Sequence, residues 1–140
     1  MAEFTANANQ TVAPGAAVLF DSTAIVPNRS IYHRDGSAIF TLRGLTYQPF
    51  ARFKVVVGGN VAVPTGGTAG PITFAIAISG EPDENTTMQV TPAAVGEYFN
   101  ISRETYINVP GGCCTQISLE NTTATEADIK NVNLIIERVA

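Results

Sequence analysis

The feature that most constrains this chain is a series of short segments in which large apolar side chains alternate with small or polar ones. The alternation is clearest in residues 52–57, 72–79 and 115–120. Successive side chains of a β-strand point to opposite faces of the sheet, so a period of two gives each strand one buried face. No window of ten residues has a convincing helical period. The sequence therefore predicts an all-β protein.

Glycine, proline, asparagine and aspartate separate these segments, as turn residues do. Ten candidate strands result, and they cover residues 4–12, 16–20, 31–34, 37–43, 51–57, 72–79, 86–91, 97–109, 115–121 and 129–139. About ten short strands at this spacing are typical of a sandwich or a barrel. Because the chain has 140 residues, with no linker and no repeat, we expect a single domain covering residues 1–140.

Three local features make more specific structural predictions. Asp35-Gly36 lies between the apolar pairs Ile31-Tyr32 and Ile39-Phe40, which predicts a tight hairpin. Residues 58–71 are rich in glycine and proline, so we expect a long surface loop there. The last segment, 129–139, stays apolar to its end, which predicts a central strand with a neighbour on each side.

The composition leaves two interpretations of the surface open. Only 14% of the residues are charged and there is no Trp, whereas an ordinary soluble domain is about 25% charged. Either the chain is a subunit that hides much of its surface against copies of itself, or it is a small β domain with a surface of Thr, Asn and Ser.

The same numbers argue against several partners and locations. The net charge is -4 and there is no cluster of Lys and Arg, so we expect no nucleic-acid partner. No apolar stretch approaches the roughly 20 residues of a membrane helix, so we expect no membrane span. The first residues lack the basic and apolar parts of a secretory signal peptide, which predicts synthesis in a cytoplasm.

No residue pattern points to catalysis, to a cofactor or to a metal. His33 is the only histidine and flanks a predicted turn, and residues 58–71 contain no Gly-Lys-Ser/Thr phosphate loop. The acidic turn 81–84 could hold calcium weakly or be simply solvated. The adjacent Cys113 and Cys114 are expected to be free thiols, one of them packed inward, rather than a redox or metal site. We therefore expect a non-enzymatic protein.

Two predicted strands have apolar or aromatic side chains on both faces. In 97–109, the face with Phe99, Ile101, Ile107 and Val109 is the expected core face, while Tyr98 and Tyr106 lie on the other face. In 129–139, Ile135 and Val139 lie opposite the expected core residues. Such outer faces commonly face a partner, although scattered exposed apolar residues are also normal. Tyr98, Tyr106, Ile135 and Val139 are therefore the candidate interface between copies of the chain.

Ten strands in about 140 residues, with sheet-forming segments at both ends, resemble the ten-stranded jelly roll of the tumour necrosis factor/C1q-like family. The resemblance implies two packed sheets of antiparallel strands and association of three subunits around a three-fold axis. The aromatic signature of C1q is not met, because Gly96-Glu97-Tyr98 is followed directly by Phe99. The resemblance is therefore to the architecture of the family.

Several short phrases are also similar to small proteins of phages and prophages of gut Firmicutes. They are Thr41–Thr46, Val63–Thr68, Val90–Val95 and Asn133–Val139. This resemblance implies a virion component made in the bacterial host, such as a trimeric capsid decoration protein or a fibre head that contacts other capsid proteins. The alternative is a carbohydrate- or receptor-binding module on the same scaffold, which would bind a host-surface glycan.

Overall fold

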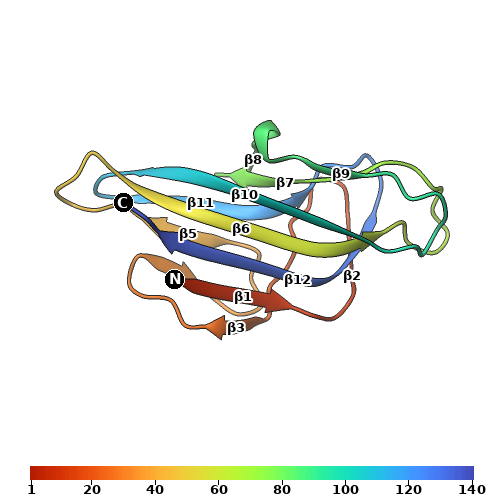
Figure 1. Ribbon diagram of the computed structural model, residues 1–140, viewed down its shortest axis with the longest axis horizontal. Helices are drawn as coiled ribbons and strands as arrows, with labels where there is room; N and C mark the ends of the chain where they lie inside the picture. The colour runs from red at the N-terminus through yellow and green to blue at the C-terminus, as the bar shows by residue number, and fades with distance from the viewer.

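A computed structural model describes all 140 residues and consists of two antiparallel sheets packed face to face (Figure 1). The β6 sheet has the order β10 (Phe99–Pro110), β6 (Phe50–Ala62), β12 (Ala127–Arg138), β1 (Ala2–Ala6) and β3 (Ser22–Ile25), and β2 (Gln10–Val12) also pairs with β12. The β11 sheet has the order β4 (Ile31–His33), β5 (Phe40–Arg43), β11 (Cys114–Asn121), β7 (Ile72–Ile78) and β8 (Glu81–Pro82), and β9 (Met88–Val90) also pairs with β7. The all-β prediction is confirmed.

The only helical element is one short turn of 3₁₀-helix, η1 (Glu84–Thr86). The side chain of Asp83 accepts a hydrogen bond from the Asn85 amide at its start. The Thr86 hydroxyl is buried and donates to the carbonyl oxygens of Asp83 and Ile76. No helix is long and apolar enough to cross a membrane.

One hydrophobic core fills the space between the sheets. It contains 29 buried residues, and both sheets contribute alternate residues of their strands. Its aromatic centre joins them, because Phe4 of β1 lies 4.9 Å from Phe40 of β5 between ring centroids. His33 stacks on Phe40 at 4.1 Å, and its ring nitrogens lie 3.0 and 3.1 Å from the carbonyl oxygens of Ile39 and Phe20. His33 is thus part of the packing beside a turn.

The last strand is central, as the sequence predicts. β12 pairs with β6 on one side and with β1 on the other. A bulge interrupts β12, where Asn131 and Val132 lie opposite the single residue Gly59 of β6. Asn131 has a φ of 51°, a conformation that asparagine tolerates better than most residues. The bulge shifts the alternation, so that Ile129 before it and Val132 after it are both buried.

Three strand boundaries differ from the prediction. Residues 4–12 form two strands, β1 and β2, that are separated by a turn at 7–9. Residues 16–20 make only isolated bridges, at Ala17 and Phe20, and the strand in this region is β3. Here backbone pairing to the end of β11 replaces a regular strand, because Val18 donates to the carbonyl of Leu119.

The predicted loop 58–71 begins later than expected, because β6 continues to Ala62. A Cβ atom on Gly58 would lie 3.3 Å from Asn133 Oδ1, and one on Gly59 would lie 3.1 Å from Ile129 Cδ1. These glycines therefore permit close approach of β12 and do not mark a turn. The sequence alone does not distinguish these two uses of glycine.

The predicted hairpin at Asp35-Gly36 is confirmed as antiparallel pairing of β4 with β5. The turn is closed by a hydrogen bond from the Ser37 amide to the Arg34 carbonyl, and Gly36 has a φ of 91°. The connection runs from Arg34 to Ile39 and is longer than a two-residue turn. The Gly36 amide also donates to the Phe20 carbonyl, which ties the turn to the segment before β3.

Candidate interaction surface on the β6 sheet

The outer face of the β6 sheet has an apolar centre. Val56 of β6 lies opposite Ile135 of β12, and both side chains are half-buried although no layer covers this face. The same row continues with Glu104 of β10 next to Val56 and with Glu3 of β1 next to Ile135. The apolar pair is thus flanked by two carboxylates.

The neighbouring row adds an aromatic side chain and an ion pair. Tyr106 of β10 lies opposite Lys54 of β6, which lies opposite Glu137 of β12. Tyr106 is 58% exposed, and Lys54 Nζ lies 3.5 Å from Glu104 Oε1. Because these two charged side chains are both well exposed to solvent, we expect their ion pair to contribute little to folding stability.

The end of the same face is hollowed. Arg52, Tyr106, Val139 and Ala140 line an open concavity of about 430 Å³, and Val139 is exposed. We refer to Val56, Tyr106, Ile135 and Val139 as the β6 patch. The structure therefore brings three of the four predicted interface residues to one half of one face.

The fourth predicted residue, Tyr98, is not part of the β6 patch. It precedes β10 and lies eight positions before Tyr106, which corresponds to about 26 Å along an extended strand. Its hydroxyl donates to Asn9 Oδ1 at 3.1 Å, and Lys130 Nζ lies 4.0 Å from its ring centroid. Burial, with a smaller effect of Asp128, raises the pKa of Tyr98. Tyr98 thus contacts its own subunit at the far end of the sheet.

The predicted core face of the same strand holds only in part. Ile101, Ile107 and Val109 are buried, but Phe99 is 38% exposed because it is the first residue of β10 and lies beyond the edge of the core. Sequence reasoning also missed Val56. The signal was present, because Val55, Val56 and Val57 form an unbroken apolar run in a segment that otherwise alternates.

The adjacent cysteines are both exposed, so the expectation that one packs inward is wrong. Cys113 lies in the turn before β11 and Cys114 begins the strand, which places both side chains on the same side, with 3.1 Å between their Sγ atoms. A hydrogen bond with Cys113 and, to a smaller extent, burial raise the pKa of the Cys114 thiol. They are free thiols, as predicted.

The acidic turn does not gather its carboxylates around one point, and no three metal-ligating side chains converge anywhere in the chain. Asp83 caps η1 instead. Burial and, secondarily, the charge of Glu81 raise the pKa of Glu120 on the nearby strand β11. Nothing in this turn is arranged like a cation site.

Solved structures place this two-sheet arrangement. The Eiger tumour necrosis factor of S. frugiperda superimposes with a TM-score of 0.69 and 9% identity, over 99% of this chain and 91% of that one. The globular domain of zebrafish complement 1qA superimposes with a TM-score of 0.61 and 9% identity, over 96% of this chain and 94% of that one. The fold is a TNF/C1q-like jelly roll. No family model matches the sequence, and no curated protein is similar to it in sequence.

The jelly roll confirms the predicted fold class and the architectural resemblance. Identities of 9% support likeness of fold alone. The surface of this jelly roll, and not its fold, must therefore carry the argument about function.

Proposed function

We propose that this chain is a non-enzymatic jelly-roll subunit that associates with copies of itself as a homotrimer through the β6 patch. The observation that carries the proposal is the apolar pair Val56–Ile135 at the centre of a sheet face that no other part of the chain covers. Tyr106 and Val139 extend this pair toward the end of the sheet. Burial of apolar surface contributes about 25 cal/mol per Å², and tyrosine keeps a polar group available at such an interface.

The charges around the β6 patch suit contact between identical subunits. Arg52 and Lys54 provide positive charge, whereas Glu3, Glu104 and Glu137 provide negative charge on the same face. In a closed three-fold ring, a patch on one subunit meets a different surface of the next subunit. β10 is an edge strand of the same sheet, so its free edge is available as that second surface.

We propose further that the trimer is exposed on a phage particle, as a capsid decoration protein or the head of a short fibre. This part rests on the sequence phrases similar to phage and prophage proteins, which lie in Thr41–Thr46, Val63–Thr68, Val90–Val95 and Asn133–Val139. Its test is immunogold labelling of particles released by prophage induction, with antibodies raised against the purified chain. We expect gold on the particle surface; label only in the soluble fraction would contradict the virion location.

The trimer is tested by placing a charge in the β6 patch. Ile135→Asp puts a carboxylate beside Glu3 at the apolar centre, so we expect monomers in size-exclusion chromatography with light scattering. The control is Gln116→Asp, which puts the same group on the exposed outer face of the β11 sheet. It should leave the trimer intact. Trimers of unchanged stability in Ile135→Asp would contradict the proposed interface.

A second candidate function is recognition of a saccharide, as in a carbohydrate- or receptor-binding module. The observation that favours it is Tyr47, which is 97% exposed in the connection between β5 and β6. An exposed aromatic ring offers an apolar face on which a sugar can stack. A glycan array would test this function, with selective binding that Tyr47→Ala abolishes as the expected result.

A further inference from the structure

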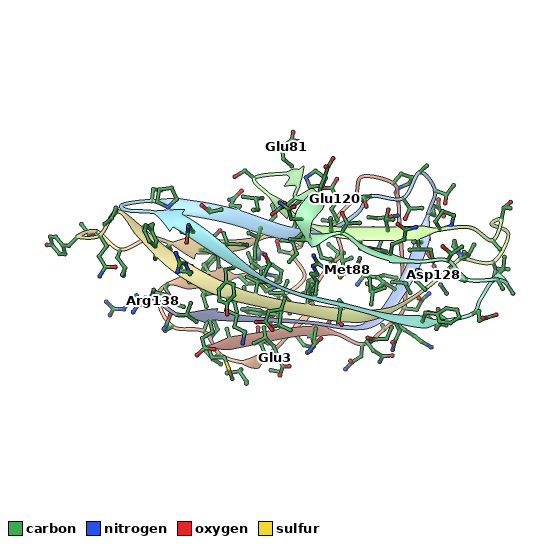
Figure 2. The ribbon with its side chains drawn as sticks, turned by 45° about the horizontal axis from the view of Figure 1, so that its top comes forward. Glu3, Glu81, Met88, Glu120, Asp128 and Arg138 are labelled. Carbon is green, nitrogen blue, oxygen red and sulfur yellow. The ribbon has the colours of Figure 1, made fainter.

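Three arginines line one open pocket at the end of the sandwich. Arg29 lies in the connection between β3 and β4, Arg43 ends β5, and Arg138 ends β12. Figure 2 shows Arg138 at the end of the molecule where β12 stops. The pocket has a volume of about 480 Å³, which lies in the range of small-molecule sites. It contains no residue of the β6 patch.

The pocket concentrates positive charge in an acidic protein. The chain has only eight Lys and Arg residues against twelve Asp and Glu, yet three of the eight line this pocket and none of the twelve does. Like charges repel, so gathering them without a counter-ion has an electrostatic cost that a bound anion would offset. The arrangement therefore indicates an anionic ligand.

The three guanidinium groups also have free donors. None of them forms a side-chain hydrogen bond or an ion pair within the chain, whereas the Arg52 side chain donates to Asn108 and the Arg103 side chain donates to the Asn85 carbonyl. A guanidinium carries five N–H donors in a planar fork that matches carboxylate, sulfate or phosphate oxygens. Three such groups around one pocket provide donors on several sides of an oxyanion.

Local hydrogen bonds hold the backbone of the pocket in place. Asn28 Oδ1 accepts from the amide and the hydroxyl of Ser30, which fixes the turn that carries Arg29. The Arg43 amide donates to the Ser30 carbonyl at 2.8 Å. The anchor points of Arg29 and Arg43 are thus tied to each other, and less ordering is needed when a ligand binds.

The rest of the lining suits a hydroxylated ligand. Asn28 and Ser30 are polar, and Leu45 is the one apolar residue of the pocket. Two residues beyond Leu45, the exposed Tyr47 lies on the same connection. Polar side chains, an oxyanion site and a free aromatic ring on one end of the molecule fit a charged sugar better than an apolar compound.

We propose that the pocket of Arg29, Arg43 and Arg138 binds the carboxylate or sulfate group of an acidic saccharide. This inference gives the second candidate function its ligand class and rests on that function. It does not depend on self-association, because the residues of the pocket and of the β6 patch are different.

The test is isothermal titration calorimetry of the purified protein with four probes. They are sialyllactose, which carries a carboxylate; a sulfated heparin-derived disaccharide; lactose, which is neutral; and sodium sulfate. We expect saturable binding of at least one of the two acidic sugars, and much weaker binding of lactose and sulfate. Arg43→Gln and Arg138→Gln should each weaken binding about tenfold, since each removes charge-assisted hydrogen bonds.

The matched control is Arg34→Gln. Arg34 is exposed, has no side-chain hydrogen bond or ion pair and lies at the other end of β4, outside the pocket. This variant makes the same change in net charge, so its affinity should equal that of the wild type. An equal loss in Arg34→Gln would show a general charge effect and overturn the proposed pocket.

The remaining outcomes separate the inference from the function on which it rests. Binding of lactose that is unaffected by Arg43→Gln and Arg138→Gln would overturn the anionic pocket and leave saccharide recognition standing. Sulfate binding as tightly as the acidic sugars would make this a simple anion site and overturn the saccharide assignment. No binding of any sugar, together with no hit on the glycan array, would overturn both.

Discussion

The outer faces of the two sheets differ, although their inner faces build one core. On the β11 sheet, the outward residues of the central strands are small or polar, as at Thr41, Gln116 and Ser118. On the β6 sheet, the corresponding centre is Val56 and Ile135. Figure 2 shows Glu3 and Glu81 projecting from opposite sides of the molecule, so both outer faces also carry charge. Apolar side chains on the inner faces are required by folding; those on one outer face need another explanation, and contact with a second copy provides it.

The largest effect is expected on the shared inner faces. Phe4 is fully buried and lies against Phe40 and His33. Phe4→Ala should lower the free energy of unfolding by about 3–5 kcal/mol, because it removes a ring and leaves a cavity. Urea unfolding followed by circular dichroism measures this loss.

The control for Phe4→Ala is an aromatic residue on the outer face of the β11 sheet. Tyr32 is 56% exposed, so Tyr32→Ala should change the free energy of unfolding by less than about 1 kcal/mol. If the two variants lost equal stability, the distinction between inner and outer faces would fail.

A smaller effect is expected at the bulge of β12, which sets the side chains that face outward. Asn131 has a positive φ that a β-branched residue resists. Asn131→Val should therefore lower the unfolding free energy by about 1–2 kcal/mol, while Asn131→Gly should be as stable as the wild type. Thermal unfolding of both variants would check this, and a stable Asn131→Val would argue against the bulge.

The smallest effect is expected at Glu120, on the outer face of the β11 sheet. Its pKa in the folded chain is raised by burial and by Glu81, so the folded state holds this proton to higher pH than the unfolded state does. Stability from this group is therefore present at low pH and is lost as pH rises from about 4, the usual carboxyl value, through the raised pKa.

Glu120→Gln removes this titration. The variant should be slightly more stable than the wild type at pH 7, and the difference should shrink toward pH 4. Melting temperatures measured across this range provide the check. A difference that is constant with pH would mean that Glu120 acts through packing and not through its charge.

The sequence predicts the core well and the surfaces poorly. Alternation identifies Ile72, Phe74 and Ile76 as buried because a period of two is a local property. The bulge at Asn131 and the close approach at Gly59 depend on the partner strand, so no local pattern distinguishes them from turns.

The candidate sites show the same limit. Tyr98 and Tyr106 have the same parity in sequence, but the length of β10 keeps them apart. Arg29, Arg43 and Arg138 are far apart in sequence and lie in different parts of the fold, so only the chain topology brings them to one pocket. Alternation predicts which side of a strand a residue occupies, but not its position along the sheet.

The most direct test of self-association is the molar mass of the wild-type protein in solution. Size-exclusion chromatography with multi-angle light scattering at micromolar concentration should give about 44 kDa, three times the 14.7 kDa of one chain. A mass of 14.7 kDa that persists across the concentration range would leave Val56 and Ile135 facing water and would contradict the proposed trimer.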